Sequence, residues 1–136
     1  MNGSLRDLEG VLDLEWYGID LRPGTRVDEV ADAATWPGLP DVLFDLVVCT
    51  EVLEHAPTPG LIVMNAYEQL RTEGYLLLTC AGPGREAHSV DGSPGLGTEH
   101  YANIPACTLR RWCRFFAQAL VIENHDSHDL YCLAVK

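Results

Sequence analysis

The sequence predicts an α/β fold: a mainly parallel sheet with helices on both faces and an antiparallel C-terminal strand. Three observations predict it. Apolar runs alternate with segments of helical periodicity along the 136 residues. The early apolar runs each lead into acidic residues, as strands of a parallel sheet do where they reach a site. The last two apolar runs are joined by a short polar segment, and so short a connection requires antiparallel neighbours.

The N-terminal third is predicted to contain a short helix near 3–9, strands near 15–21 and 27–31, and a strand at 44–50. In the last of these, Leu46, Val47 and Val48 follow one another without alternation. A continuous apolar run is typical of a central parallel strand that is buried on both faces.

The middle of the chain predicts a helix near 60–72 followed by a buried strand at 75–80. Pro59 suits the first turn of the helix, and Gly74 is expected to end it. The core face of the helix is expected to be formed by residues at helical spacing, namely Val63, Ala66, Tyr67 and Leu70.

The C-terminal third begins with a Gly/Pro/Ser-rich stretch at 82–99, which is long enough to predict a functional or mobile loop. A helix near 105–119 follows, with the two antiparallel strands at 120–123 and 130–135 after it. The apolar stripe of that helix comprises Leu109, Trp112, Cys113, Phe116 and Leu120. No repeat and no domain boundary is visible, so residues 1–136 are expected to form a single domain.

The composition excludes several classes of function. A formal net charge of −11 argues against direct binding of nucleic acid; it suits a cationic ligand, or it reflects solubility alone. No apolar run approaches the roughly 20 residues of a membrane-spanning helix, and the N-terminus lacks the apolar core of a secretory signal. We therefore expect no membrane partner and a cytoplasmic location.

Cysteine and histidine spacing gives no sign of a metal site. The five cysteines contain no C-x-x-C pair, so neither a disulfide framework nor a zinc site is expected. Three of them, Cys49, Cys80 and Cys132, fall in apolar strands and are expected to be buried thiols in a reducing compartment. Three histidines without metal-ligand spacing, His88, His125 and His128, are expected on the surface.

Candidate binding residues follow the strands. Asp20 could accept two ribose hydroxyls or merely cap a turn, and Asp32, which follows the next strand, could cap a helix at 33–36. Glu51 could stabilise a positive ligand, and His55 could accept a proton. The alternative places Glu51 and Glu54 in an exposed first helical turn that His55 ends.

Residues 16–22, 31–33 and 44–55 together resemble the cofactor-binding half of a class I S-adenosylmethionine-dependent methyltransferase of type 11. The resemblance implies a Rossmann-like fold and S-adenosylmethionine as cofactor. It implies that Asp20 binds the ribose, Leu21 packs on the adenine, and Asp32 with Ala33 reads the adenine. It also implies that Thr50 and Glu51 lie beside the methionine end and that His55 lies near the substrate, where we expect it to be the catalytic base.

The resemblance is weaker in the long loop that begins at residue 82 and at the N-terminus. His100 and Tyr101 either contact the substrate from the long loop or anchor that loop. Gly3 corresponds to the end of the family's glycine-rich turn, which together with the first strand is largely missing. Three explanations are open. The true start of the protein lies upstream, another chain supplies the first strand, or the sheet closes without this strand and the cofactor site is degenerate. A homo-oligomer or a partner chain that completes the sheet is therefore expected in one of these cases.

The leading hypothesis is methyl transfer to a small molecule or an exposed side chain, with the protein mainly orienting the two reactants. The alternative is a non-catalytic, methyltransferase-like interaction or assembly module, because an exposed sheet edge invites pairing with another chain. The absence of G-x-G-x-x-G after a strand and of G-x-x-x-x-G-K-[ST] disfavours nicotinamide and phosphate-loop enzymes.

Overall fold

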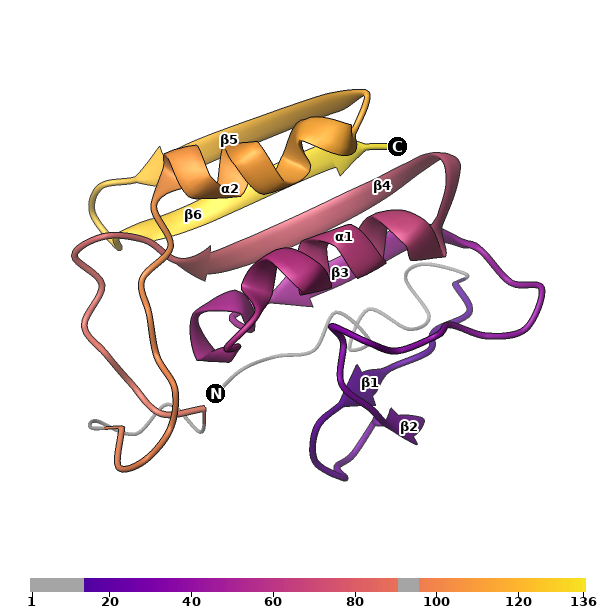
Figure 1. The fold of residues 1–136 in the computed structure, drawn as a ribbon, viewed down its shortest axis with the longest axis horizontal. Helices are drawn as coiled ribbons and strands as arrows, with labels where there is room; N and C mark the ends of the chain where they lie inside the picture. Colours follow the sequence, from indigo (N-terminus) through magenta and orange to yellow (C-terminus); the bar gives the residue numbers. More distant parts are fainter. Residues whose placement is uncertain (1–13, 91–95) are drawn as a thin grey trace. The chain divides into compact units, whose positions relative to one another are not determined.

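A computed structural model describes residues 14–90 and 96–136 (Figure 1). The chain divides into two compact units, residues 1–33 and 34–136, and each is described by itself. The helix expected near 3–9 lies outside the described residues.

The first unit contains two short parallel strands, β1 (Ile19–Asp20) and β2 (Glu29–Val30). They lie inside the predicted segments 15–21 and 27–31 but are much shorter. The turn between them folds back on Gly18, whose carbonyl accepts the N–H groups of Asp28 and Glu29 at 2.8 and 3.2 Å. A Cβ atom at position 18 would lie 2.4 Å from the carbonyl oxygen of Arg26, so this close approach requires glycine.

The second unit is built on a four-stranded mixed sheet in the order β3-β4-β6-β5. Strand β3 (Phe44–Thr50) runs parallel to β4 (Leu70–Ala81), and β6 (Asp129–Val135) runs antiparallel to both β4 and β5 (Gln118–Asn124). The parallel pair and the antiparallel C-terminal strands confirm the sequence-based prediction of an α/β fold with an antiparallel end.

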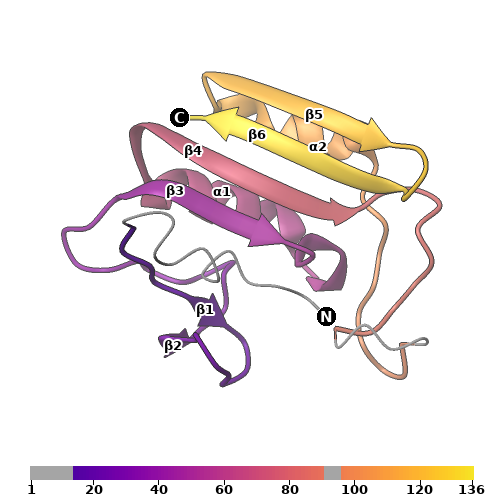
Figure 2. The ribbon, with the colours of Figure 1, turned by 180° about the vertical axis from the view of Figure 1, so that it is seen from behind.

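Two α-helices, α1 (Pro59–Gln69) and α2 (Ala106–Trp112), pack on the same face of this sheet, as Figures 1 and 2 show from opposite sides. Short 3-10 helices, η2 (Leu53–His55) and η3 (Cys113–Phe115), precede α1 and follow α2. Helices were predicted on both faces, but residues 34–136 supply only one helical layer. Among the described helices, none is long and apolar enough to cross a membrane.

Strand β4 begins earlier than the sequence predicts. Helix α1 ends at Gln69, and Gly74, expected to stop the helix, lies within the strand. The extension is held by Lys136, whose N–H donates to the carbonyl of Gly74 while its own carbonyl accepts from Glu73, both at 3.0 Å. A Cβ atom at Gly74 would lie 2.8 Å from the carbonyl oxygen of Arg71, so the glycine serves a close backbone approach rather than a helix end.

Two further expectations are corrected. The helix predicted over 105–119 ends as a 3-10 turn at Phe115, and Leu120 of its expected stripe lies in β5 with 58% of its surface exposed. Strand β3 is not central in the described sheet: it pairs only with β4, and Leu46 is 38% exposed. The pairing of strands in the sheet, rather than the local sequence periodicity, determines where this helix ends and where β3 lies in the sheet.

The core lies between the sheet and the two helices. Cys49, Leu78, Cys132 and Val121 are register neighbours across the four strands, and all four are buried. The helices contribute Ile62, Val63, Ala66, Leu109 and Cys113 to the same interior. The next row across the sheet points the opposite way, and its members Leu133 and Leu120 are exposed.

Buried thiols give a first testable prediction. Four cysteines are buried and Cys107 is exposed, and burial raises the pKa of Cys49 to about 12 and that of Cys80 above its ordinary value. Because thiolate is the reactive form, one thiol should react rapidly with Ellman's reagent in the native protein and five after denaturation. Cys107→Ser should abolish the rapid phase. A second rapid native thiol would contradict this core.

Candidate functional site

The carboxyl end of β3 leads directly into a strained turn. Thr50 ends the strand, and Glu51 follows with a φ of 56°, in the left-handed region that a non-glycine residue rarely adopts. The N–H of Glu51 donates to the carbonyl of Thr79 at 3.0 Å, which fixes this conformation against β4. Such backbone strain costs about 1–3 kcal/mol and concentrates at functional sites.

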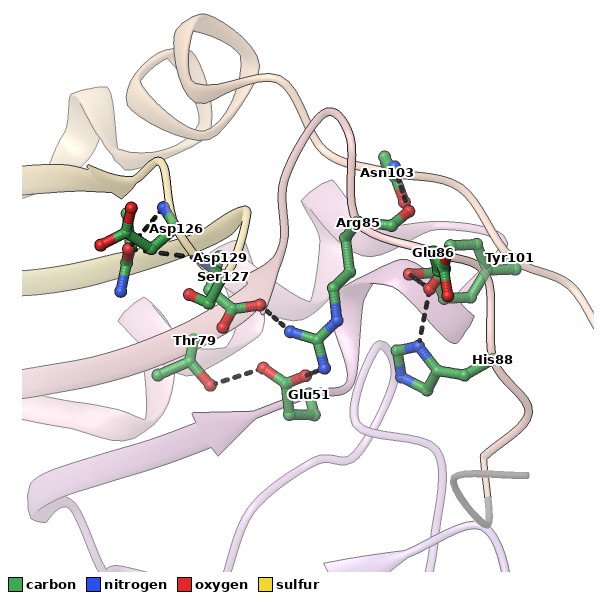
Figure 3. Close-up of polar contacts among 11 residues, drawn as sticks. Glu51, Thr79, Arg85, Glu86, His88, Tyr101, Asn103, Asp126, Ser127 and Asp129 are labelled. Atoms are coloured by element: carbon green, nitrogen blue, oxygen red, sulfur yellow. Dashed lines mark hydrogen bonds and ion pairs between the residues drawn. The ribbon is translucent and has the colours of Figure 1, made fainter. Parts of the chain in front are cut away.

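The Glu51 carboxylate is held from two sides (Figure 3). Its Oε1 accepts a hydrogen bond from Thr79 Oγ1 at 3.0 Å, and its Oε2 lies 3.9 Å from a guanidinium nitrogen of Arg85. Arg85 also pairs with Asp129 at the start of β6, and that contact is the closer of the two. The Glu51 carboxylate is therefore oriented at the carboxyl end of β3. Asp129, not Glu51, is the main ion-pair partner of Arg85.

Glu54 is the residue that sequence reasoning misjudged most. One reading placed it in an exposed helical turn, but η2 is a single 3-10 turn that points Glu54 inward, with none of its surface exposed. Neither carboxylate oxygen makes a well-formed hydrogen bond among the described residues, and the donors near it are the backbone N–H groups of Glu54 and Ala81. The pKa of Glu54 is raised from 4.5 to about 7, chiefly by burial; the backbone N–H groups of Glu54 and Ala81 offset part of the rise, and the neighbouring Glu51 adds to it.

His55 lies in a cluster of three rings with His88 and Tyr101. The ring centroids are 5.1 Å apart for His55 and His88, 5.3 Å for His55 and Tyr101, and 5.1 Å for His88 and Tyr101, all edge to face. Burial, and secondarily the neighbouring His88, lowers the pKa of His55. His88, expected at the surface, is partly exposed and contacts the other two rings of this cluster.

The loop that follows β4 is tied down around this cluster. The Tyr101 hydroxyl donates to the carbonyl of Glu86 at 3.3 Å, and the N–H of Ala102 donates to the carbonyl of Glu54 at 2.8 Å. His100 is exposed and does not take part in the ring cluster. His100 and Tyr101, which were expected to act together, therefore differ in their surroundings: Tyr101 lies against His55, whereas His100 is exposed to solvent.

The remaining predicted site residues lie in the first unit. Asp20 ends β1, is exposed, and accepts the N–H of Arg22 through Oδ1 at 2.9 Å, which is the turn-capping geometry. Leu21 is 70% exposed, and Asp32 is also exposed beside a half-buried Ala33. Residues 33–35 form a turn, so the alternative of a helix cap at Asp32 is not observed. Gly3 lies outside the described residues.

Comparison with known proteins identifies a family. The sequence profile of a family described as "Methyltransferase domain" matches residues 8–78, more than half of the chain. Among curated proteins, no sequence matches significantly. The match spans β1, β2, β3, α1 and most of β4, and so it includes the strand ends that carry Asp20, Asp32 and Glu51.

Solved structures share the fold at low sequence identity. N-methyltransferase NodS from Bradyrhizobium japonicum, with bound S-adenosylhomocysteine, is 16% identical with a TM-score of 0.53, over 87% of this chain and 64% of NodS. The 1,6-didemethyltoxoflavin-N1-methyltransferase from Burkholderia thailandensis is 16% identical with a TM-score of 0.56, over 87% of this chain and 59% of that enzyme. A methyltransferase from Methanosarcina mazei is 13% identical with a TM-score of 0.54, over 88% and 79%. The chain thus spans less than two thirds of NodS and of the Burkholderia enzyme.

Proposed function

The chain belongs to the methyltransferase domain family, and from that premise we propose that it transfers a methyl group from S-adenosylmethionine to a small molecule or an exposed side chain. The cofactor supplies an electrophilic methyl group on a sulfonium centre. The protein's part is to bind the two reactants in line and to accept the proton that the acceptor loses.

The observation that supports this proposal best is the strained turn at Glu51. The turn presents an oriented carboxylate where a parallel strand ends, which is where α/β sheets bind ligands. Thr79 and Arg85 use part of its acceptor capacity, and a carboxylate has about four lone-pair sites. Glu51 therefore retains room to accept from the cationic methionine end of the cofactor, with Thr50 beside it.

Residues of the first unit would hold the nucleoside end. In the proposed assignment, Asp20 accepts from the ribose, Leu21 packs on the adenine, and Asp32 with Ala33 reads the adenine edge. Asp20 supports this role in part, because Arg22 engages only its Oδ1. Gly3, outside the described residues, is proposed as a further cofactor-binding residue.

His55 is proposed as the base. Its lowered pKa keeps the imidazole neutral near pH 7, so a nitrogen lone pair is available to take a proton. Tyr101 packs against this ring and would contact the acceptor with it, and His100 would contact the acceptor from the same loop.

A second candidate is a methyltransferase-like interaction module whose cofactor site is degenerate. The observation that favours it is the open edge of β3, which within the described residues pairs on one side only, with β4. An unpaired edge is a template for a strand of another chain.

Calorimetric titration with S-adenosylmethionine distinguishes the two candidates. We expect binding to the unmodified chain, weakened by about 10–100-fold in Asp20→Ala and in Glu51→Gln, because hydrogen bonds to charged groups contribute roughly 1.5–3 kcal/mol. Asp45→Asn is the matched control: it removes a carboxylate from β3 itself, but from an exposed side chain that pairs with Arg71. Its affinity should be unchanged. A folded protein that does not bind the cofactor would favour the interaction module instead.

A further inference from the structure

We propose that Glu54, His55 and His88 form a binding site for a divalent transition-metal ion. Each side chain offers one ligand atom, and the three atoms lie within 4.8 Å of one another. Two of the residues come from η2 and the third comes from the loop after β4, so the fold brings together residues that are distant in the sequence. This inference does not depend on methyl transfer, and with an ion bound His55 would act as a ligand and not as the base proposed above.

The buried carboxylate is the strongest argument for a cation. Glu54 has no exposed surface, and neither of its oxygens makes a well-formed hydrogen bond among the described residues. The charged side chain that acts on it is another carboxylate, Glu51. A buried acidic group that lacks a well-formed hydrogen bond and a cationic partner is costly, and such groups are normally paired or bound to a metal. A cation beside Glu54 would supply the missing partner.

His88 is oriented as a metal ligand should be (Figure 3). Its Nδ1 lies 3.2 Å from the carbonyl oxygen of Glu86, so the Nδ1–H donates there and the lone pair on Nε2 is left for a ligand role. The same carbonyl accepts from the Tyr101 hydroxyl at 3.3 Å. The Nδ1 atom of His55 is buried and also has no hydrogen-bond partner among the described residues. Second-shell contacts of this kind fix ring orientation before an ion binds.

The ligand set selects the class of ion. One carboxylate and two imidazoles suit zinc, cobalt or nickel, whereas magnesium and calcium prefer oxygen ligands throughout. Tetrahedral zinc with bonds of about 2.1 Å places its ligand atoms roughly 3.4 Å apart, so the three side chains must close in slightly on binding. Three protein ligands leave a coordination position for water or for another molecule.

Cobalt(II) is the probe for the test because its visible absorption reports coordination directly. Chelator-treated protein carrying Cys107→Ser, which removes the exposed thiol as a competing ligand, is titrated with cobalt and then with zinc. We expect visible bands of a bound ion, displacement of cobalt by zinc, and a rise in melting temperature with zinc. His88→Gln should weaken binding by at least roughly the 10–100-fold that loss of a second-shell partner costs.

Matched variants make the outcome decisive. His125→Gln changes an exposed histidine outside the cluster and should bind cobalt like the parent. Glu54→Gln removes the carboxylate at nearly constant volume and should lose the bands while circular dichroism shows a retained fold. Absence of cobalt bands in the parent, or equal affinity in the parent and His88→Gln, would overturn the site. Neither result involves S-adenosylmethionine. A failure of the metal site in this test would therefore leave the proposed methyl transfer untouched, and a failure to bind the cofactor would leave the metal site untouched.

Discussion

Replacing Leu78 with alanine should lower the free energy of unfolding by about 2–5 kcal/mol. Leu78 has no exposed surface and lies in β4, between Cys49 of β3 and Cys132 of β6 in the register. The side chain faces α1 and α2, so its removal leaves a cavity that neither the flanking strands nor the helices can easily fill. Urea unfolding followed by circular dichroism at one temperature measures the loss.

Leu133→Ala is the control that isolates the cavity term. Leu133 lies in β6 and pairs with Leu77, the neighbour of Leu78 in β4. Its side chain points to the opposite face of the sheet from that of Leu78 and is 46% exposed. The same chemical change on the same sheet should therefore cost only about 1 kcal/mol, since nearly half of the Leu133 surface stays in water in the folded protein. Similar losses in the two variants would mean that the second face is covered as well and that the single helical layer is not the native arrangement.

The strands were predictable because their signals are local. Continuous apolar runs at 44–50 and 75–80, and the short polar link before 130–135, predict the parallel pair β3-β4 and the antiparallel pair β5-β6. The boundary at Gly74 was not predictable, because a glycine that ends a helix and a glycine that allows backbones to meet look alike in sequence. Hydrogen bonds to Lys136, at the far end of the chain, decide between them.

The candidate site was predictable only in part, for a related reason. Thr50, Glu51 and His55 follow a strong strand signal, and the structure places them at the end of β3 and in the turn after it. The inward direction of Glu54 depends on η2 being one 3-10 turn rather than the start of a longer helix. The contact of His88 with His55 depends on the path of the loop after β4, which has no periodicity to read. The single-domain organisation over 1–136 and the cofactor roles stay predictions.

Glu54 should make the unfolding free energy depend on pH in an unusual direction. Its pKa is about 7 in the folded protein against 4.5 ordinarily, so the folded state binds more protons than the unfolded state between these values. The contribution of Glu54 to stability is fully present below pH 4.5 and is lost as the pH rises through 7. A shift of this size amounts to about 3 kcal/mol. Urea unfolding between pH 4.5 and 8, in buffer containing EDTA so that no bound cation offsets the charge, measures it.

Glu54→Gln should remove this loss, because the amide does not ionise. The difference in unfolding free energy between the variant and the parent should therefore move in favour of the variant by about 3 kcal/mol from pH 4.5 to pH 8. Glu68→Gln, at an exposed position on α1, changes the same functional group and should leave the parent's pH dependence intact. If the two variants follow the same pH profile, Glu54 is ionised at little cost, and the buried carboxylate that supports the metal site is absent in solution.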